Sequence, residues 1–120
     1  MTPEKRIRIA NLTRNTELAS SAEVADSAMA RNKGLLGRAS LEPGGGLWIV
    51  PCQSVHTFFM KFAIDLVYIG KDKKVKKVRS SVHPWRTSAC FSAHSIIELP
   101  AGVIQNTHTA RGDQLQFSTD

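Results

Sequence analysis

Cysteine is scarce in this chain of 120 residues, which contains only Cys52 and Cys90. A small secreted domain held together by disulfide bonds usually carries more, so that class is disfavoured. Long apolar runs are also missing, because no stretch approaches the roughly 18 residues that a membrane-spanning helix needs. The first six residues carry positive charge with no apolar segment behind them. We therefore expect a cytoplasmic protein without a signal peptide or membrane span.

Acidic residues are outnumbered, with 10 Asp and Glu against 16 Lys and Arg and a formal net charge of +6. This balance favours solubility and weak attraction to polyanions, but it identifies no partner. The length fits one domain, residues 1–120. A domain of this size buries roughly two thirds of its unfolded surface, so folding requires neither a metal nor a disulfide. No cofactor is predicted, and the oligomeric state stays open.

The residue pattern changes from helical to β at about residue 47. Ser20-Ser21-Ala22-Glu23 fits a capping box, which predicts a helix from about Ala22 to about Lys33. Short strands are predicted at 6–10, 47–50, 54–59, 64–69, 74–82, 95–99, 103–107 and 115–117. One helix in the N-terminal half and several short strands predict a mainly β domain, folded as an antiparallel sandwich or barrel.

Residues 51–60 hold the most reactive chemistry. A thiol, a hydroxyl and an imidazole stand at alternate positions, Cys52, Ser54 and His56. On a strand they share one face, together with Phe58 and Met60. Cys52 is thus a candidate nucleophile and His56 a candidate base.

Strand geometry works against that pair. Residues four apart on a strand are separated by about 13 Å, so catalysis requires a bend at Pro51. Asp65 or Glu98 are candidates to orient the imidazole, since each interrupts an apolar run. The alternative interpretation makes Cys52 a small buried residue and His56 a hydrogen-bonded one.

Cysteine and histidine recur with the same spacing, since Cys90 and His94 repeat the separation of Cys52 and His56. Four such ligands match the number in a structural zinc site, but zinc sites usually pair like ligands in short knuckles. A Cys52–Cys90 disulfide is a second possibility. Two free thiols are favoured, and no metal is predicted.

A run of basic residues lies at 71–79. Its members are Lys71, Lys73, Lys74, Lys76, Lys77 and Arg79. The run has no interleaved aromatic residue for base stacking, so it predicts a solvated strand edge and no specific nucleic-acid binding.

Trp85 follows a proline in a segment predicted to be irregular. Its side chain either lines a ligand pocket or plugs one end of the barrel.

Several sequence blocks occur together in one order. They are Gly34-Leu35-Leu36-Gly37-Arg38, Gly46-Leu47-Trp48-Ile49, Pro51-Cys52, Ser54 to Met60, Phe62, Ile64-Asp65, Pro84-Trp85-Arg86, Cys90, Glu98 to Gly102 and Gly112-Asp113. With these blocks, about residues 7–117 resemble the bacterial and archaeal family catalogued as domain of unknown function 192. The resemblance implies a compact mainly β domain of sandwich or jelly-roll character, and it implies no established activity, cofactor or ligand. Many relatives carry an export signal or lipoprotein anchor, which we do not expect here.

Burying a polar group in an apolar strand costs free energy unless the group is paired or used. On this ground we expect a non-catalytic domain that binds a small ligand or a partner. A thiol-dependent enzyme and a structural or oligomerising module are the alternatives. The expected site consists of Cys52, Ser54, His56, Asp65, Trp85 and Glu98.

Overall fold

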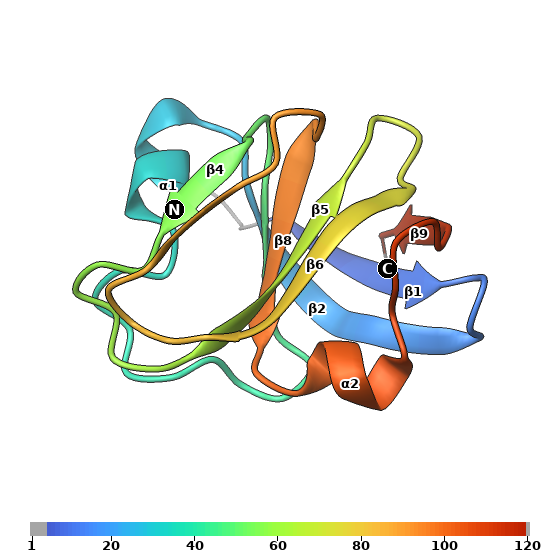
Figure 1. Ribbon diagram of the computed structural model, residues 1–120, viewed down its shortest axis with the longest axis horizontal. Coiled ribbons are helices and arrows are strands. Elements are labelled where there is room, and N and C mark those ends of the chain that lie inside the picture. The colour runs from blue at the N-terminus through green and yellow to red at the C-terminus, as the bar shows by residue number, and fades with distance from the viewer. Residues whose placement is uncertain (1–4, 120) are drawn as a thin grey trace.

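A strongly curled β-sheet dominates the computed structural model, which describes residues 5–119 (Figure 1). The described part holds nine strands and two short helices, and neither helix is long and apolar enough to cross a membrane. The strands are β1 Arg6–Asn11, β2 Thr16–Ala25, β3 Leu47–Ile49, β4 Ser54–His56, β5 Ile64–Ile69, β6 Val75–Val82, β7 Thr87–Ala89, β8 Ser95–Pro100 and β9 Leu115–Ser118, and the helices are α1 Ala28–Lys33 and α2 Val103–Thr107.

Seven strands form one sheet in the order β6-β5-β8-β3-β2-β1-β9, and β4 pairs with β7 in a separate small sheet. Every pair is antiparallel except β2 with β3. The edges of the large sheet meet at one end, where Lys74 bridges Gln114 and the Leu115 N–H donates to the Lys73 carbonyl over 3.0 Å. The predicted mainly β class is confirmed, but the sheet forms a curled half-barrel, and a sandwich or jelly roll is not confirmed.

Apolar side chains pack on both faces of the central strands. One cluster fills the inside of the curl and includes Val67, Ile97 and Ile104. The other lies between the outer face and the layer of α1, β4 and β7, and it includes Leu66 and Ile96. Strands β5 and β8 are therefore buried along nearly their whole length. A polar side chain on either strand destabilises the fold unless it is paired.

The predicted helix from about Ala22 to about Lys33 starts too early, because residues 16–25 form β2. The capping box at Ser20 to Glu23 is overridden by long-range pairing. The Ser20 and Ser21 N–H groups donate to the Gly44 carbonyl, and Ala22 lies opposite Ile7 on β1. Helix α1 begins only at Ala28, and Ser27 caps it by accepting from the Ala30 N–H over 3.1 Å.

The predicted strand 103–107 is also wrong, since these residues form α2. Its first residue, Val103, is β-branched, which suggested a strand. The helix begins here because Asp65 accepts hydrogen bonds from the Gly102 and Ile104 N–H groups. The helix cap thus comes from β5 and is invisible in the local sequence.

The predicted strand 54–59 is too long, because β4 ends at His56. The chain turns at Phe59, whose φ of 65° is left-handed. Phe58 and Phe59 consequently face solvent, whereas Met60 is buried. Strand β7, which pairs with β4, lies in the segment that the sequence predicted to be irregular.

Candidate functional site

A cavity of about 220 Å³ lies between α1 with its following turn, β4 and the outer face of β8. It brings together four of the six predicted site residues, Cys52, Ser54, His56 and Glu98. The remainder of its lining is Arg31, Asn32, Lys33, Gly34, Leu35, Leu36, Ile49, Val55 and Met60. The cavity therefore combines an apolar wall with a thiol, a hydroxyl, an imidazole and a carboxyl group.

Glu98 is the most unusual group in this cavity. It lies in the middle of β8, only 4% exposed, and its Oε1 atom has no hydrogen-bond partner. Burial raises the pKa of its carboxyl group from 4.5 to about 7, and the Arg38 guanidinium offsets only part of that rise. Arg38 itself forms an ion pair with Glu23 at 2.6 Å. Close to neutral pH, Glu98 is thus able both to donate and to accept a proton or a hydrogen bond.

The turn after α1 passes close to this carboxyl group at Gly34. Gly34 caps the C-terminal end of α1 with a φ of 50°, and a Cβ at this position would lie 3.6 Å from Glu98 Oε1. The left-handed φ disfavours other residues. Gly34 therefore lets the backbone pass close to the carboxyl group without filling the cavity.

Cys52 lines the cavity as a free, half-buried thiol. Its Sγ donates to the Ser54 carbonyl over 3.1 Å. Cys90 is also a free thiol, and its Sγ lies 3.4 Å from Ser92 Oγ. The two cysteines therefore make local contacts in place of the disulfide that the sequence left open.

His56 lies at the end of β4, where its Nδ1 accepts a hydrogen bond from the Phe58 N–H over 3.3 Å. A neutral imidazole that accepts at Nδ1 carries its proton on Nε2. In this arrangement Nε2 is a donor, so it is unable to take a proton from Cys52. Among the described residues, no hydrogen bond joins the thiol to the imidazole.

Asp65 lies on the opposite face of the sheet. Asp65 pairs with Leu99, whereas Glu98 pairs with Leu66, so the two carboxyl groups point to different sides. The carboxylate of Asp65 accepts from the N–H groups of Ser81, Gly102 and Ile104 at 2.8–3.1 Å. Its hydrogen-bonding capacity is used to hold α2 and β6.

Trp85 lies outside the cavity, in a group of exposed rings. Its ring centroid is 5.8 Å from that of Phe58 and 4.7 Å from that of Phe59. Trp85 also has a left-handed φ of 67°. It therefore forms part of a surface feature and does not line the Glu98 cavity.

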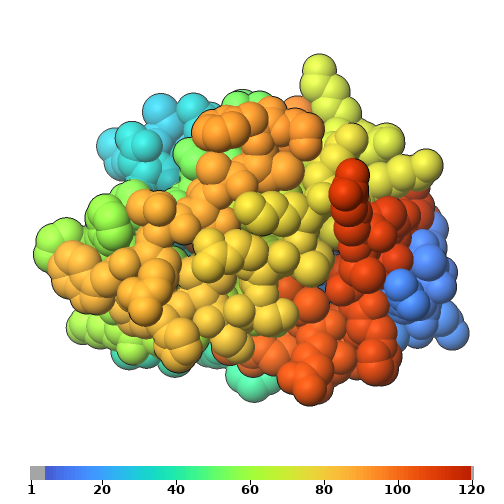
Figure 2. All heavy atoms as spheres, in the orientation of Figure 1, coloured from blue at the N-terminus to red at the C-terminus, as the bar shows by residue number. Residues whose placement is uncertain are grey.

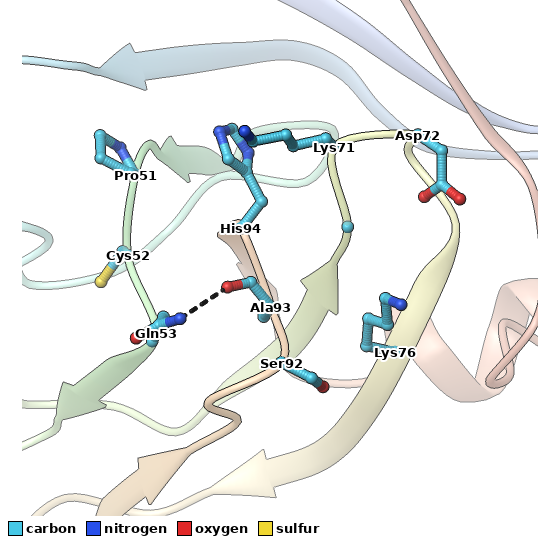
Figure 3. Close-up of a pocket in the computed structure, with 10 residues that line it drawn as sticks. Pro51, Cys52, Gln53, Lys71, Asp72, Lys76, Ser92, Ala93 and His94 are labelled. Atoms are coloured by element: carbon cyan, nitrogen blue, oxygen red, sulfur yellow. Dashed lines mark hydrogen bonds between the residues drawn. The ribbon is translucent and has the colours of Figure 1, made fainter.

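Cys52 also lines a second, more open pocket of about 670 Å³, together with His94 (Figure 3). The Cys52 sulfur points away from His94, whose Nδ1 is buried without a partner (Figure 3). Across residues 5–119, no three His, Cys, Asp or Glu side chains are grouped so that they could hold a metal ion. The four candidate zinc ligands, Cys52, His56, Cys90 and His94, are thus not brought together.

Tyr68 is a polar residue near the cysteines that the sequence did not single out. It is fully buried, and its hydroxyl lies 2.6 Å from Ser88 Oγ. Burial raises the pKa of Tyr68, with small contributions from Cys90 and Cys52. A tyrosine inside an apolar strand looks like an ordinary core residue, so only the position of Ser88 on β7 reveals the pair.

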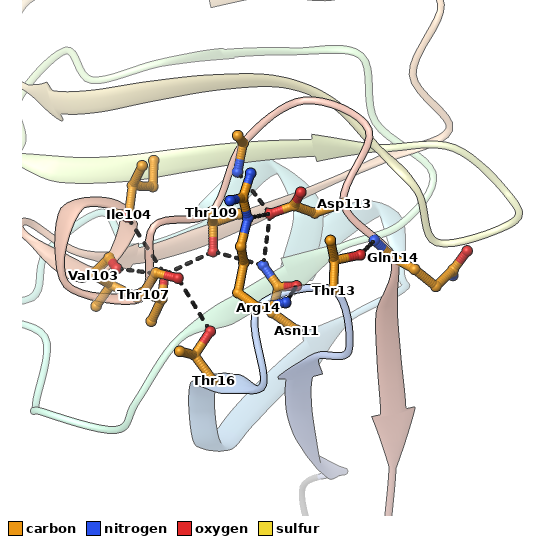
Figure 4. Close-up of polar contacts among 11 residues, drawn as sticks. Asn11, Thr13, Arg14, Thr16, Val103, Ile104, Thr107, Thr109, Asp113 and Gln114 are labelled. Carbon is orange, nitrogen blue, oxygen red and sulfur yellow. Dashed lines mark hydrogen bonds and ion pairs between the residues drawn. The ribbon is translucent and has the colours of Figure 1, made fainter.

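A buried polar network fastens the end of the half-barrel (Figure 4). Asp113 accepts from Asn11 Nδ2 and from Arg14 Nε, both over 3.0 Å. Burial alone would raise the pKa of Asp113, but the hydrogen bonds from Asn11, Arg14 and the Ala110 N–H, with the Arg14 charge, lower it overall. Because its partners are all internal, this network belongs to the scaffold.

The family described as "Uncharacterized ACR", domain of unknown function 192, matches residues 10–117. The chain belongs to this family. The resemblance found in the sequence is thereby confirmed.

Relatives match over nearly the whole chain. A UPF0127 protein of Pyrococcus furiosus is 30% identical over 115 residues, which are 90% of this chain and 96% of the relative. A UPF0127 protein of Pyrococcus horikoshii is 29% identical over 118 residues, covering 92% and 99% of the two chains. These relatives are similar in length to this chain.

Two solved structures share the fold. A Sinorhizobium meliloti protein described as a candidate transcription regulator has a TM-score of 0.82 at 19% identity, covering 96% of this chain and 94% of its own. A Novosphingobium aromaticivorans protein of unknown function has a TM-score of 0.77 at 16% identity, covering 92% and 83%. At such identities the likeness shows the fold alone.

Proposed function

We propose that this protein is a non-catalytic domain that binds a small ligand in the Glu98 cavity. The observation that carries the proposal is the Glu98 carboxyl group, which is buried in the centre of the sheet with Oε1 unpartnered. An unsatisfied buried polar atom costs about 1–3 kcal/mol. A ligand that pairs with Oε1 removes this cost, which supports binding over a purely structural role.

The shape and chemistry of the cavity restrict the ligand. Its volume of about 220 Å³ is smaller than that of a site for a drug-sized molecule. Glu98 is the only acidic residue in the described lining, and Ser54 supplies a hydroxyl group. A compact molecule with an amine, amide or hydroxyl group fits best, because such a group donates to Oε1 while its carbon atoms contact Ile49 and Met60.

Thermal unfolding with a library of small amines, amides, alcohols and metal ions tests this proposal. A ligand at 100 times its dissociation constant stabilises the folded state by about 2.7 kcal/mol. We expect at least one compound to raise Tm for the wild type and for Glu42→Gln, which alters an exposed glutamate. The same compound should give a much smaller rise with Glu98→Gln.

Two results would count against a ligand at Glu98. If no compound changes Tm, the structural or oligomerising module becomes the better interpretation. If a compound raises Tm equally in the wild type and in Glu98→Gln, the ligand binds elsewhere. Both variants retain side chains of nearly the wild-type size, so loss of packing does not confuse the comparison.

A thiol-dependent enzyme is the second candidate, because one cavity holds Cys52, His56 and Glu98. The hydrogen bonds of the thiol and imidazole do not support it, since each group is engaged with backbone. Iodoacetamide labelling of Cys52 in a Cys90→Ser variant distinguishes the two functions. Labelling at neutral pH no faster than that of a free thiol favours the binding domain, whereas much faster labelling favours the enzyme.

A further inference from the structure

Three large aromatic side chains gather on the surface at one end of the molecule. Phe58, Phe59 and Trp85 are 37%, 69% and 57% exposed. The light green segment after β4 and the orange segment after β6 lie side by side at the left edge of Figure 2. We call residues 57–62 and 83–86 the aromatic loops. Contiguous apolar surface of this kind usually marks an interaction site.

The aromatic loops are held in a defined conformation. Phe59 and Trp85 both have left-handed φ angles, which are rare for bulky residues and persist only where the surroundings impose them. The buried Thr57 imposes them here. Its Oγ1 donates to the His83 carbonyl over 2.7 Å and accepts from the Arg86 N–H over 2.9 Å.

The backbone of Thr57 also forms hydrogen bonds to both aromatic loops. Its carbonyl accepts from the N–H groups of Trp85 and Met60 over 3.0 and 3.1 Å, respectively. Thr57 thus joins both loops at their bases and leaves the rings outside. Exposed rings on a fixed backbone lose little conformational freedom when a partner covers them.

The two sequence segments that contain these loops carry charge of one sign. Neither Asp nor Glu occurs in residues 43–64 or 73–97, the two segments that contain the loops. Lys61 and Arg86 lie within the loops and are exposed. The complementary partner is therefore anionic and accepts apolar side chains.

We propose that the aromatic loops dock on an anionic lipid membrane surface. Aromatic rings beside basic residues suit the boundary between headgroups and acyl chains. Phe58 stacks on Trp85 at a centroid distance of 5.8 Å, and the Phe59 ring is tilted by 59° against Trp85 at 4.7 Å, so the three rings pack on one another and do not form a row of parallel platforms for nucleic-acid bases. Phe58 also lines an open pocket with Lys77 and Arg79, which adds basic side chains beside the rings. This surface is independent of the Glu98 ligand.

Sedimentation with lipid vesicles tests the proposal. We expect binding to phosphatidylcholine vesicles that contain about 30% phosphatidylserine, weak binding without phosphatidylserine, and loss of binding as salt rises. Trp85→Ala or Phe59→Ala should weaken binding about tenfold, from the transfer of one ring out of water. Phe91→Ala is the matched control, since Phe91 is 79% exposed outside the aromatic loops.

A charge-reversal pair tests the electrostatic part. Lys61→Glu should weaken binding at least fivefold, since each basic residue near an anionic surface contributes about 1 kcal/mol. Lys71→Glu changes the same charge on the turn between β5 and β6, away from the loops, and should change binding much less (Figure 1). Equal effects of the two substitutions would show that net charge alone drives binding, which would overturn the proposal.

Brominated lipids provide a readout that requires no variant. If Trp85 enters the interface, bromine on the acyl chains should quench part of the tryptophan fluorescence of the wild-type protein. The absence of binding and quenching would overturn the proposal. So would stronger binding of an acidic peptide or a single-stranded oligonucleotide that is weakened by Trp85→Ala, because the surface would then serve another class of partner.

Discussion

Replacing Glu98 with glutamine should remove a pH dependence of folding that wild-type Glu98 creates. The buried carboxyl group has its pKa raised from 4.5 to about 7. Between these values the folded protein retains a proton that the unfolded chain has released. The stabilising contribution is therefore complete below about pH 4.5 and is lost as the pH rises through 7.

The magnitude follows from the same pKa values. Each pKa unit corresponds to about 1.4 kcal/mol, so moving Glu98 from its protonated to its ionised state costs the folded wild type about 3 kcal/mol by pH 8. Glu98→Gln is neutral at every pH and has almost the same shape. The variant should be close to the wild type in stability near pH 5 and more stable by up to about 3 kcal/mol near pH 8.

Urea unfolding at several pH values between 5 and 8 measures this difference. For a small protein, 3 kcal/mol shifts the midpoint by about 1–3 M urea, well above the error of the method. Glu42→Gln is the control, since its side chain is exposed. Parallel stability curves for the wild type and Glu98→Gln across this range would refute a raised pKa for Glu98.

Three further substitutions test the scaffold. Asp65→Asn should destabilise by about 3 kcal/mol in urea unfolding, because the backbone N–H groups that cap α2 lose a charged acceptor. Asp113→Asn should cost about 2 kcal/mol at pH 7. Since the pKa of Asp113 is lowered, wild-type stability from this group is present above about pH 4 and lost below it, so urea curves of the two proteins should converge in acid. Tyr68→Phe should cost about 1 kcal/mol by the same assay, because it removes the hydroxyl from the pair with Ser88.

Local residue patterns correctly predicted strands whose pairing partner is the next segment of the sequence. The β-branched and aromatic run followed by Gly70 identified β5 with its observed ends, Ile64–Ile69. Its hairpin partner β6 begins one residue later than predicted, at Val75. In both cases the turn is adjacent in sequence, so local information was sufficient.

The two wrong elements depend on distant partners. Residues 20–25 join β2 because β1 and the loop at Gly44 supply hydrogen bonds that no helix signal reveals. Residues 103–107 form α2 because Asp65, on β5, caps the helix. Neither partner is within a local window of sequence, so propensity alone favoured the wrong structure.

The candidate site was predictable only in part. The alternate spacing of Cys52, Ser54 and His56 indicated a shared environment, and the structure places all three around one cavity. The sequence predicted a helix that ends near Lys33, where α1 ends, but its predicted start at Ala22 put a helix where β2 lies. The exposure of Phe58 and Phe59 was not predictable either, because a block of apolar residues is typical of a core.

Asp65 and Glu98 show most clearly why an acidic residue in an apolar run does not by itself identify a site. Both interrupt buried strands, and both are almost inaccessible. They belong to adjacent residue pairs of the β5–β8 ladder, because Asp65 lies opposite Leu99 while Glu98 lies opposite Leu66. Adjacent pairs point to opposite faces of the sheet. On one face the neighbouring segments present backbone N–H groups, which satisfy Asp65 completely. On the other face, α1 and β4 leave a cavity, and Oε1 of Glu98 has no partner. The strand register therefore makes Asp65 part of the scaffold and leaves Oε1 of Glu98 without a hydrogen-bond partner.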